Sequence, residues 1–379
     1  MHDIFSGGFL DLVVFCLLSL LFYIFYCAPG RKPYLYYTSS SFTDYVIKRC
    51  PRLGQPFQPA PVATNRHLQT LLPGFLPRPS VVVEREYVDL PDGGCCALDW
   101  VVQSGPFCCR NGDGGMPVFI VLPGLTGDAR SASHLCSFAL ERGYRPVVFN
   151  KRGHGGSRLK TPKVQSFGDP DDFRVVVEYI HSKYPDALLT AFGSSAGSGL
   201  LVSYLGEYGR ECIISFAVLV SPGYDAEFLF KNCIRHPYDF LLVSMLKNVL
   251  NQNRDILAKT VDMDKVMQAK SLITIEQELY CTLYGYSSMD EYWKHNNPVR
   301  NPTNISIPVL AISSLDDPIC TKECIQYSLF SDKMNHSILV TTEQGGHCGF
   351  LEGWRFDHWA DKIGLDYLDA ALEFHNSSQ

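Results

Sequence analysis

Short apolar runs alternate along most of this chain with segments whose apolar residues recur at helical spacing. Residues 81–88 and 96–102 flank a turn at Pro91–Gly94, a pattern typical of a β-hairpin. Buried strands are predicted for the later runs 117–122, 146–149, 190–193, 213–220, 307–313 and 337–342. Helices are predicted for 131–142, 173–184 and 198–208. This alternation predicts an α/β architecture, with a mostly parallel sheet covered by helices on both faces.

One connection is much longer than the others. More than eighty residues separate the strand that ends at Val220 from the strand that begins at Ile307, whereas ordinary crossovers are far shorter. The insertion is dense in aromatic and aliphatic residues, as in Tyr238–Leu246. We expect a helical cap at about 224–300, with most of its apolar side chains packed inside it and a minority lining an apolar slot.

The N-terminal part carries a long apolar segment. Residues 9–28 are almost wholly apolar, with Asp11 as the interruption, and roughly 20 helical residues at about 1.5 Å each match a bilayer core of about 30 Å. We expect a short tail at 1–8 and a single membrane-spanning anchor at 9–28. A cleaved signal peptide is the competing interpretation, but residues 1–11 contain no Lys or Arg and its apolar region is usually shorter.

The segments that follow set the expected domain boundaries. Residues 29–80 are rich in Pro, Tyr and polar residues and are predicted to form a membrane-proximal arm, followed by a folded domain at 81–368 and a C-terminal tail at 369–379. Basic residues after the apolar segment favour a cytosolic domain. The three sequons at Asn304, Asn335 and Asn376 would be usable on the opposite side, so the sequence leaves the side of the membrane open.

The strongest candidate for chemistry is Gly193-Ser194-Ser195-Ala196-Gly197, where a predicted strand meets a predicted helix. So tight a strand-to-helix turn leaves room only for small flanking residues, and it holds the central serine in a strained backbone with its hydroxyl exposed. The G-x-S-x-G pattern therefore indicates a nucleophilic serine, Ser195. Because the pattern also arises by chance, the residues that follow it in the chain matter.

An acid and a histidine follow in the order that such a serine requires. Asp316 and Asp317 come directly after the strand at 307–313, and His347 follows the strand at 337–342 through two glycines. Each residue alone is equally typical of an ordinary turn. Together, in this order and spacing, they indicate a Ser-His-Asp triad, with Asp317 as the preferred acid and Asp316 as the alternative.

An oxyanion hole needs a backbone N–H on a turn after an earlier strand. The turn Pro123–Gly127 follows the strand at 117–122, and we assign the Leu125 N–H as one donor. The second is expected to be the N–H of Ala196, at the N-terminus of the helix after the serine. His154 lies in a further turn but precedes the serine in the chain, so we expect it to be structural.

Composition excludes several other classes. The chain has 379 residues, a hydrophobic fraction of 46% and a net charge of −6, without a long basic run, which argues against a nucleic-acid partner. No Gly-rich phosphate fingerprint and no C-x-x-C pair occurs, so no cofactor and no metal are expected. Adjacent cysteines such as Cys95-Cys96 rarely build a disulfide framework. Cys348 follows the last predicted strand and is not part of the serine turn, so we do not expect it to be the nucleophile.

With these motifs in place, the chain resembles the AB hydrolase 4 family, which includes membrane-anchored α/β-hydrolase lipases and esterases. The stretches that carry the resemblance are Asn65–Thr70, Leu122–Gly127, Asn150–Gly153, Gly193–Gly197, Leu315–Pro318 and Gly345–Glu352. The resemblance implies an α/β-hydrolase fold, Ser195 as nucleophile, one aspartate of the 316–317 pair as acid and His347 as base. It also implies a type II topology with the enzyme domain on the lumenal or outer side.

The residues and the resemblance together predict a single-pass protein of the endoplasmic reticulum or plasma membrane that hydrolyses acyl esters of lipids such as monoacylglycerols or phospholipids. An acyltransferase that uses the same triad is one alternative. The H-x-x-x-x-D pattern at His181–Asp186 precedes the serine strand without an accompanying motif, so it adds no support. A lipid-binding receptor without catalysis is the second alternative, although no triad member is missing. No obligate protein partner is evident.

Overall fold

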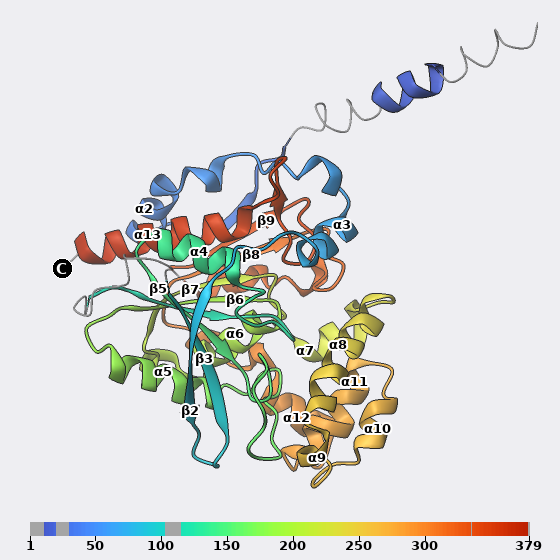
Figure 1. Ribbon diagram of the computed structural model, residues 1–379. Helices are drawn as coiled ribbons and strands as arrows, with labels where there is room; N and C mark the ends of the chain where they lie inside the picture. The colour runs from blue at the N-terminus through green and yellow to red at the C-terminus, as the bar shows by residue number, and fades with distance from the viewer. Residues whose placement is uncertain (1–10, 20–29, 103–114, 335, 378–379) are drawn as a thin grey trace, which may run out of the picture.

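Figure 1 shows a computed structural model of the chain, which describes residues 11–19, 30–102, 115–334 and 336–377. Its centre is a nine-stranded sheet with the order β1-β9-β8-β7-β6-β4-β5-β3-β2. The strands are β1 (Tyr34–Tyr37), β2 (Val82–Asp89), β3 (Cys95–Val102), β4 (Val118–Leu122), β5 (Arg145–Asn150), β6 (Leu189–Ser194), β7 (Ile214–Val220), β8 (Val309–Ser314) and β9 (Ile338–Thr342). The six strands β4 to β9 are parallel to one another, and β1, β2 and β3 pair antiparallel at the two edges.

Helices cover both faces of the sheet, as the alternation of elements predicts. On one face lie α5 (Asp171–Lys183) and α6 (Ala196–Tyr208), and on the other lie α2 (Ser41–Arg49), α4 (Ser133–Glu141) and α13 (Trp359–Ser377). Strand β4 shows why the central strands are continuously apolar. Ile120 packs in the core beneath α5 and α6, whereas its neighbour Phe119 packs in the core beneath α4 and α13. Both sides of the strand are buried, so its sequence cannot alternate.

The expected boundary at residue 80 is wrong, because the segment from residue 30 onward belongs to the folded domain. Strand β1 pairs with β9, with Tyr34 opposite Thr341, and Phe42 of α2 packs against Phe374 of α13 at a ring distance of 5.4 Å. The pattern of β1 is too short to be recognised, since this edge strand has four residues and none of them is fully buried.

The expected boundary at residue 368 is also wrong. Helix α13 continues through residue 377, and Ala370 and Ala371 lie in the same core as its first turns. Short elements complete the connections, namely α3 (Arg66–Leu71), β10 (Leu351–Glu352), β11 (Asp357–His358) and the helical turns at Pro51–Gly54, Pro61–Ala63, Leu72–Gly74, Gly209–Glu211, Pro298–Arg300, Pro302–Asn304, Lys322–Cys324 and Leu329–Lys333.

Residues 11–19 form a helix ahead of the domain. Within the described residues, none of the helices combines the length and the apolar character that a bilayer crossing needs. Residues 9–10 and 20–28 of the expected anchor, and the expected tail at 1–8, lie outside the described residues.

The long connection forms a helical layer beside one end of the sheet (Figure 1). Its elements are α7 (Ala226–Phe228), a π-helical turn at Leu229–Cys233, α8 (Tyr238–Gln252), α9 (Arg254–Leu257), α10 (Met263–Gln268), α11 (Leu272–Ile275), a second π-helical turn at Glu276–Cys281 and α12 (Met289–Asn296). This cap has a core of its own, in which Leu246, Leu250 and Tyr292 are buried. Its apolar pattern is thus explained largely by packing within the cap.

A buried ion pair ties two turns of the domain to the start of α5. Arg152, in the turn after β5, donates from Nε and Nη2 to the Asp172 carboxylate at 2.5 and 2.6 Å. Its Nη1 donates to Asp92 of the β2–β3 turn at 2.6 Å. The side chains of Arg152 and Asp172 are only 3% and 5% exposed, so each charge depends on the other for compensation.

Replacing one partner tests how much this ion pair contributes to the free energy of unfolding. We expect Asp172→Asn to lower the free energy of unfolding by about 3–5 kcal/mol, because it leaves the buried guanidinium with a weaker partner. The matched control is Asp264→Asn, whose partner Arg254 is exposed and whose loss should cost about 0–1 kcal/mol. Urea unfolding of both variants measures the difference, and equal losses would contradict a structural role for Arg152.

Candidate active site

Ser195 lies in the turn between β6 and α6, at the carboxyl end of the parallel strands. Its backbone has φ 51° and ψ −119°, a conformation that is costly for a residue with a Cβ. Hydrogen bonds to β7 hold the turn in place. The Ser195 N–H donates to the carbonyl of Val220 at 2.9 Å, and the Ser198 hydroxyl donates to the same carbonyl at 3.0 Å.

The two glycines of the motif are required by close backbone contacts. A Cβ at Gly197 would lie 2.0 Å from the carbonyl oxygen of Leu122, and a Cβ at Gly193 would lie 2.7 Å from the Cα of Ser198. Real Cβ atoms do not approach other atoms so closely, so larger residues at either position would push α6 away from the sheet. The spacing of the motif thus follows from the packing of this turn.

The structure brings the three expected side chains together. His347 Nε2 lies 2.7 Å from Ser195 Oγ, and His347 Nδ1 lies 2.9 Å from Asp317 Oδ2. Asp317 is buried, and its Oδ1 also accepts the backbone N–H groups of Ile319 and Cys320 at 2.8 and 2.9 Å. These bonds orient the carboxylate toward the imidazole, and the imidazole toward the serine.

The neighbouring aspartate has a different function. Asp316 accepts the N–H of Gly346 at 2.9 Å and the hydroxyl of Ser314, and no hydrogen bond to the His347 ring is found for it within the described residues. Geometry therefore distinguishes the two carboxylates, of which the sequence analysis prefers Asp317 and keeps Asp316 as the alternative. Asp317 contacts the imidazole, and Asp316 holds the loop that carries it.

Helix α3 is a part of the site that sequence reasoning missed. The Thr70 hydroxyl accepts the backbone N–H of His347 at 2.9 Å. The buried Gln69 side chain bonds both backbone groups of Leu351, donating at 3.0 Å and accepting at 2.7 Å. In the sequence, Asn65–Thr70 is one of the stretches that carry the family resemblance. That resemblance does not indicate that the stretch lies next to the histidine. The role of α3 is to hold the histidine loop.

The residues expected to form the oxyanion hole lie at the serine. Leu125 and Ala196 line the same cavity as Ser195, and a Cβ at Gly124 would be 3.6 Å from the Ser195 Cβ. The Lys151 ammonium donates to the Leu125 carbonyl at 3.4 Å, and burial lowers the pKa of Lys151 to about 8. This bond fixes the peptide that follows Leu125.

His154 does not reach the reacting atoms. Its Nδ1 lies 2.9 Å from the Arg152 carbonyl, and burial lowers the pKa of His154 to about 3. The ring is therefore a neutral, buried hydrogen-bonding group of the turn after β5, in line with the structural role expected for it. Cys348 follows His347, and its backbone N–H donates to the hydroxyl of Ser221 at 3.1 Å.

The cavity at Ser195 is small and apolar. Its lining includes Leu229, Phe230 and Leu242 from the cap and Ile319 from the loop after β8. The free volume is about 30 Å³, enough for about one or two water molecules. Apolar side chains of the cap therefore line the same small space as the serine, and an acyl slot there stays a prediction.

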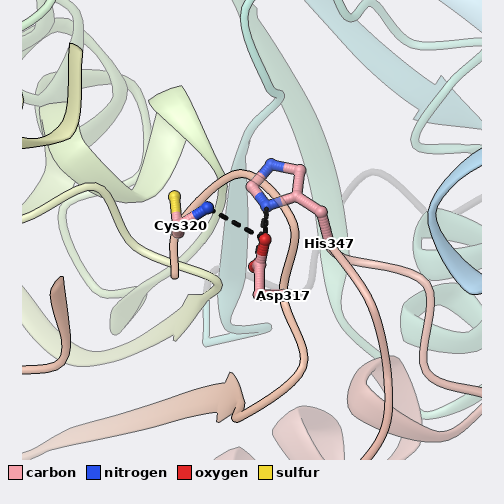
Figure 2. A group of neighbouring side chains, drawn as sticks. All are labelled: Asp317, Cys320 and His347. Atoms are coloured by element: carbon pink, nitrogen blue, oxygen red, sulfur yellow. Dashed lines mark hydrogen bonds and ion pairs between the residues drawn. The ribbon is translucent and has the colours of Figure 1, made fainter. Parts of the chain in front are cut away.

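One cluster at the site carries the ligand types of a metal centre. Ligand atoms of Asp317, Cys320 and His347 lie within 4.8 Å of one another. Figure 2 shows the Asp317 carboxylate between the His347 ring and the backbone nitrogen of Cys320. Burial raises the pKa of the Cys320 thiol to about 11, so the thiol is a weak ligand at neutral pH. The arrangement therefore favours a hydrogen-bonded pair of Asp317 and His347 over a metal centre.

Two opposing effects act on the pKa of His347. Burial, the largest effect, lowers it, but the Asp317 carboxylate together with the neighbouring Cys348 and Cys320 raises it, so the net pKa lies well above the ordinary value of 6.5. An imidazole with a raised pKa is a stronger base and stabilises the positive charge that it acquires on taking a proton. This is the property required of a residue that deprotonates a serine.

Comparisons with known proteins agree with the geometry. A model of the family described as "Serine aminopeptidase, S33" matches residues 116–352. The human Protein ABHD15 is 37% identical over 323 residues, which cover 83% of this chain and 68% of that protein. The human Phospholipase ABHD3 is 31% identical over 378 residues, covering 97% and 91%. The mouse Monoacylglycerol lipase ABHD2 is 26% identical over 381 residues, covering 93% and 89%.

Solved structures share the fold at low sequence identity. A puromycin hydrolase superposes with a TM-score of 0.52 and 16% identity, covering 78% of this chain and 40% of that one. Identity at this level is evidence for the fold alone. The family model and the human relatives show the family. The chain belongs to the α/β-hydrolase superfamily, in the AB hydrolase family of ABHD3 and ABHD15.

Proposed function

We propose that this protein hydrolyses carboxylic esters of lipids through an acyl-enzyme formed on Ser195. The observation that carries the proposal is the alignment of Ser195, His347 and Asp317 by two hydrogen bonds, at 2.7 and 2.9 Å, beside an apolar cavity. Two relatives support a lipid substrate, because their names describe a phospholipase and a monoacylglycerol lipase. The candidate substrates are accordingly acyl esters of monoacylglycerols or phospholipids.

In the first half of the reaction, Ser195 Oγ attacks the ester carbonyl while His347 Nε2 takes its proton. Asp317 holds the imidazole in the tautomer with the proton on Nδ1 and stabilises the imidazolium that forms. The N–H groups of Leu125 and Ala196 bind the negative oxygen of the tetrahedral intermediate, each contributing about 3 kcal/mol. The imidazolium then gives its proton to the leaving alcohol.

In the second half, water attacks the acyl group on Ser195. His347 takes a proton from this water, and the same N–H groups bind the oxyanion. The imidazolium then returns the proton to Ser195 Oγ as the bond to the acyl group breaks and the fatty acid leaves. An acyltransferase would use the same acyl-enzyme and differ only in the acceptor, an alcohol or lysolipid in place of water. A receptor that only binds lipid would have no need of the aligned triad.

We also propose that residues 9–28 anchor the protein in the endoplasmic reticulum or plasma membrane as a single span. The apolar composition of this segment and its length of about 30 Å as a helix support the proposal. An anchor would hold the cap close to lipid substrates, so that they could reach Ser195 without crossing bulk water.

Removing the nucleophile tests the proposed reaction. Ser195→Ala should lower kcat for a short p-nitrophenyl ester by about 10⁴–10⁶-fold and abolish labelling by a fluorophosphonate. Ser194→Ala, one residue earlier, is the control and should still be labelled. Labelling and hydrolysis that persist in Ser195→Ala would refute the assignment. Incubating the wild type with ethanol or a lysolipid separates hydrolysis from transfer, since free fatty acid as the main product excludes a dedicated acyltransferase.

The two aspartates should respond differently to the same substitution. Asp317→Asn should lower kcat by about 10⁴-fold, because the imidazole loses the partner that fixes its tautomer, whereas Asp316→Asn should cost about 10-fold through the loosened histidine loop. The raised His347 pKa keeps the imidazole protonated to higher pH, so kcat/KM should rise with pH through that pKa. In Asp317→Asn this rise should move to lower pH, and an unmoved profile would contradict the pairing.

The anchor can be tested with charges placed inside the apolar segment. The double variant Leu17→Arg, Leu18→Arg should cost about 5–7 kcal/mol of membrane insertion. We expect the wild type to stay with membranes after carbonate extraction and the double variant to be released. Leu68→Arg, which replaces an exposed leucine of α3, is the control and should stay membrane-bound. Retention of the double variant would argue against the anchor.

A further inference from the structure

A second hollow lies beside the serine cavity, on the outer side of the same walls. Its volume is about 380 Å³, and it lies between α3 and the start of the cap. The segments 228–234 and 318–321 line both spaces: Phe228, Cys233 and Pro318 face the outer hollow, whereas Leu229, Ile234 and Ile319 face the serine cavity. The outer hollow and the serine cavity therefore share a wall made of these two segments.

Hydrogen bonds connect the outer hollow to the triad over a short path. His67 Nδ1, in the lining, lies 2.8 Å from the Tyr238 hydroxyl, and the Thr70 hydroxyl donates to the carbonyl of Arg66, another lining residue, at 2.7 Å. Thr70 accepts the N–H of His347, whose ring contacts Ser195 Oγ. The two spaces are thus separated by a few side chains.

The lining of the outer hollow is basic. Arg66 and Arg235 both line it, together with His67 and His236. Within residues 30–102, 115–334 and 336–377, no ion pair with a carboxylate is found for either arginine. Glu323 is the acidic residue of the lining, and its hydrogen bond to Thr321 lowers the pKa of Glu323. Two positive charges therefore face the hollow against one negative charge.

We infer that the outer hollow binds the phosphate of a glycerophospholipid whose acyl ester reacts at Ser195, an assignment that rests on the proposed ester hydrolysis. Two planar guanidinium groups without carboxylate partners match a phosphate, which accepts paired hydrogen bonds. In a glycerophospholipid the phosphate is attached to the same glycerol as the ester. A lipid with its carbonyl at Ser195 and its acyl chain among the apolar cap residues would direct its phosphate into the basic hollow. A neutral monoacylglycerol has no phosphate to which these two arginines could bind.

Hydrolysis of two matched lipids tests the subsite in the full-length protein. Dioctanoylphosphatidylcholine and dioctanoylglycerol carry the same acyl chains with and without the phosphate, so the ratio of their kcat/KM values isolates the headgroup. We expect Arg66→Gln and Arg235→Gln each to lower this ratio about 10-fold, the loss of a charged hydrogen bond. Arg210→Gln, in the helical turn Gly209–Glu211 after α6, is the matched control. An unchanged ratio in the double variant would overturn the inference.

A binding measurement separates failure of the subsite from failure of the proposed reaction. Calorimetric titration of the full-length Ser195→Ala protein with glycerophosphocholine needs no turnover. Binding that weakens about 10-fold or more in each arginine variant supports the subsite even if no ester is cleaved, and binding that is absent or insensitive to both arginines overturns it. Inorganic phosphate is titrated in parallel. If it binds as tightly as glycerophosphocholine, the ligand is free phosphate and the lipid assignment is wrong.

Discussion

The contact between Gly197 and the carbonyl of Leu122 is the constraint on which the rest of the site depends. The two backbones approach so closely that a Cβ would lie 2.0 Å from that oxygen. This approach places the start of α6 against the end of β4, so Ser195, the Ala196 amide and the turn that carries Leu125 converge at one point. The strained backbone of Ser195 is stable because the parallel strands on either side hold it.

The histidine is positioned by groups from three separate parts of the chain. Thr70 of α3, Asp316 after β8 and Ser221 after β7 accept the backbone N–H groups of His347, Gly346 and Cys348. Three consecutive amides are therefore fixed, which leaves the imidazole little freedom beyond rotation about its own side-chain bonds. One consequence is that the segment between the apolar N-terminal stretch and the sheet is part of the catalytic framework.

The cap separates two spaces of opposite character. Its first residues turn apolar side chains toward Ser195 and line a basic hollow on their other side. Because the cap segment 228–234 lines both spaces, a shift of the cap would change the space for an acyl chain and the space beside the arginines together. The tight packing around Ser195 implies that these side chains must move to admit a long acyl chain.

The sequence by itself determined the elements and the chemistry that are local in the chain. The apolar runs of the central strands, the small residues of the turn at 193–197 and the order serine, acid, histidine can each be read without coordinates, because periodicity and turn sterics act over a few neighbouring residues. The tertiary structure alone decided the pairing of β1 with β9, the extension of α13 and the choice of Asp317 over Asp316. It alone also brought α3 to the histidine, and Arg66 and Arg235 to the lining of one hollow. These features depend on the direction of side chains and on contacts between distant segments, and no local pattern encodes either one.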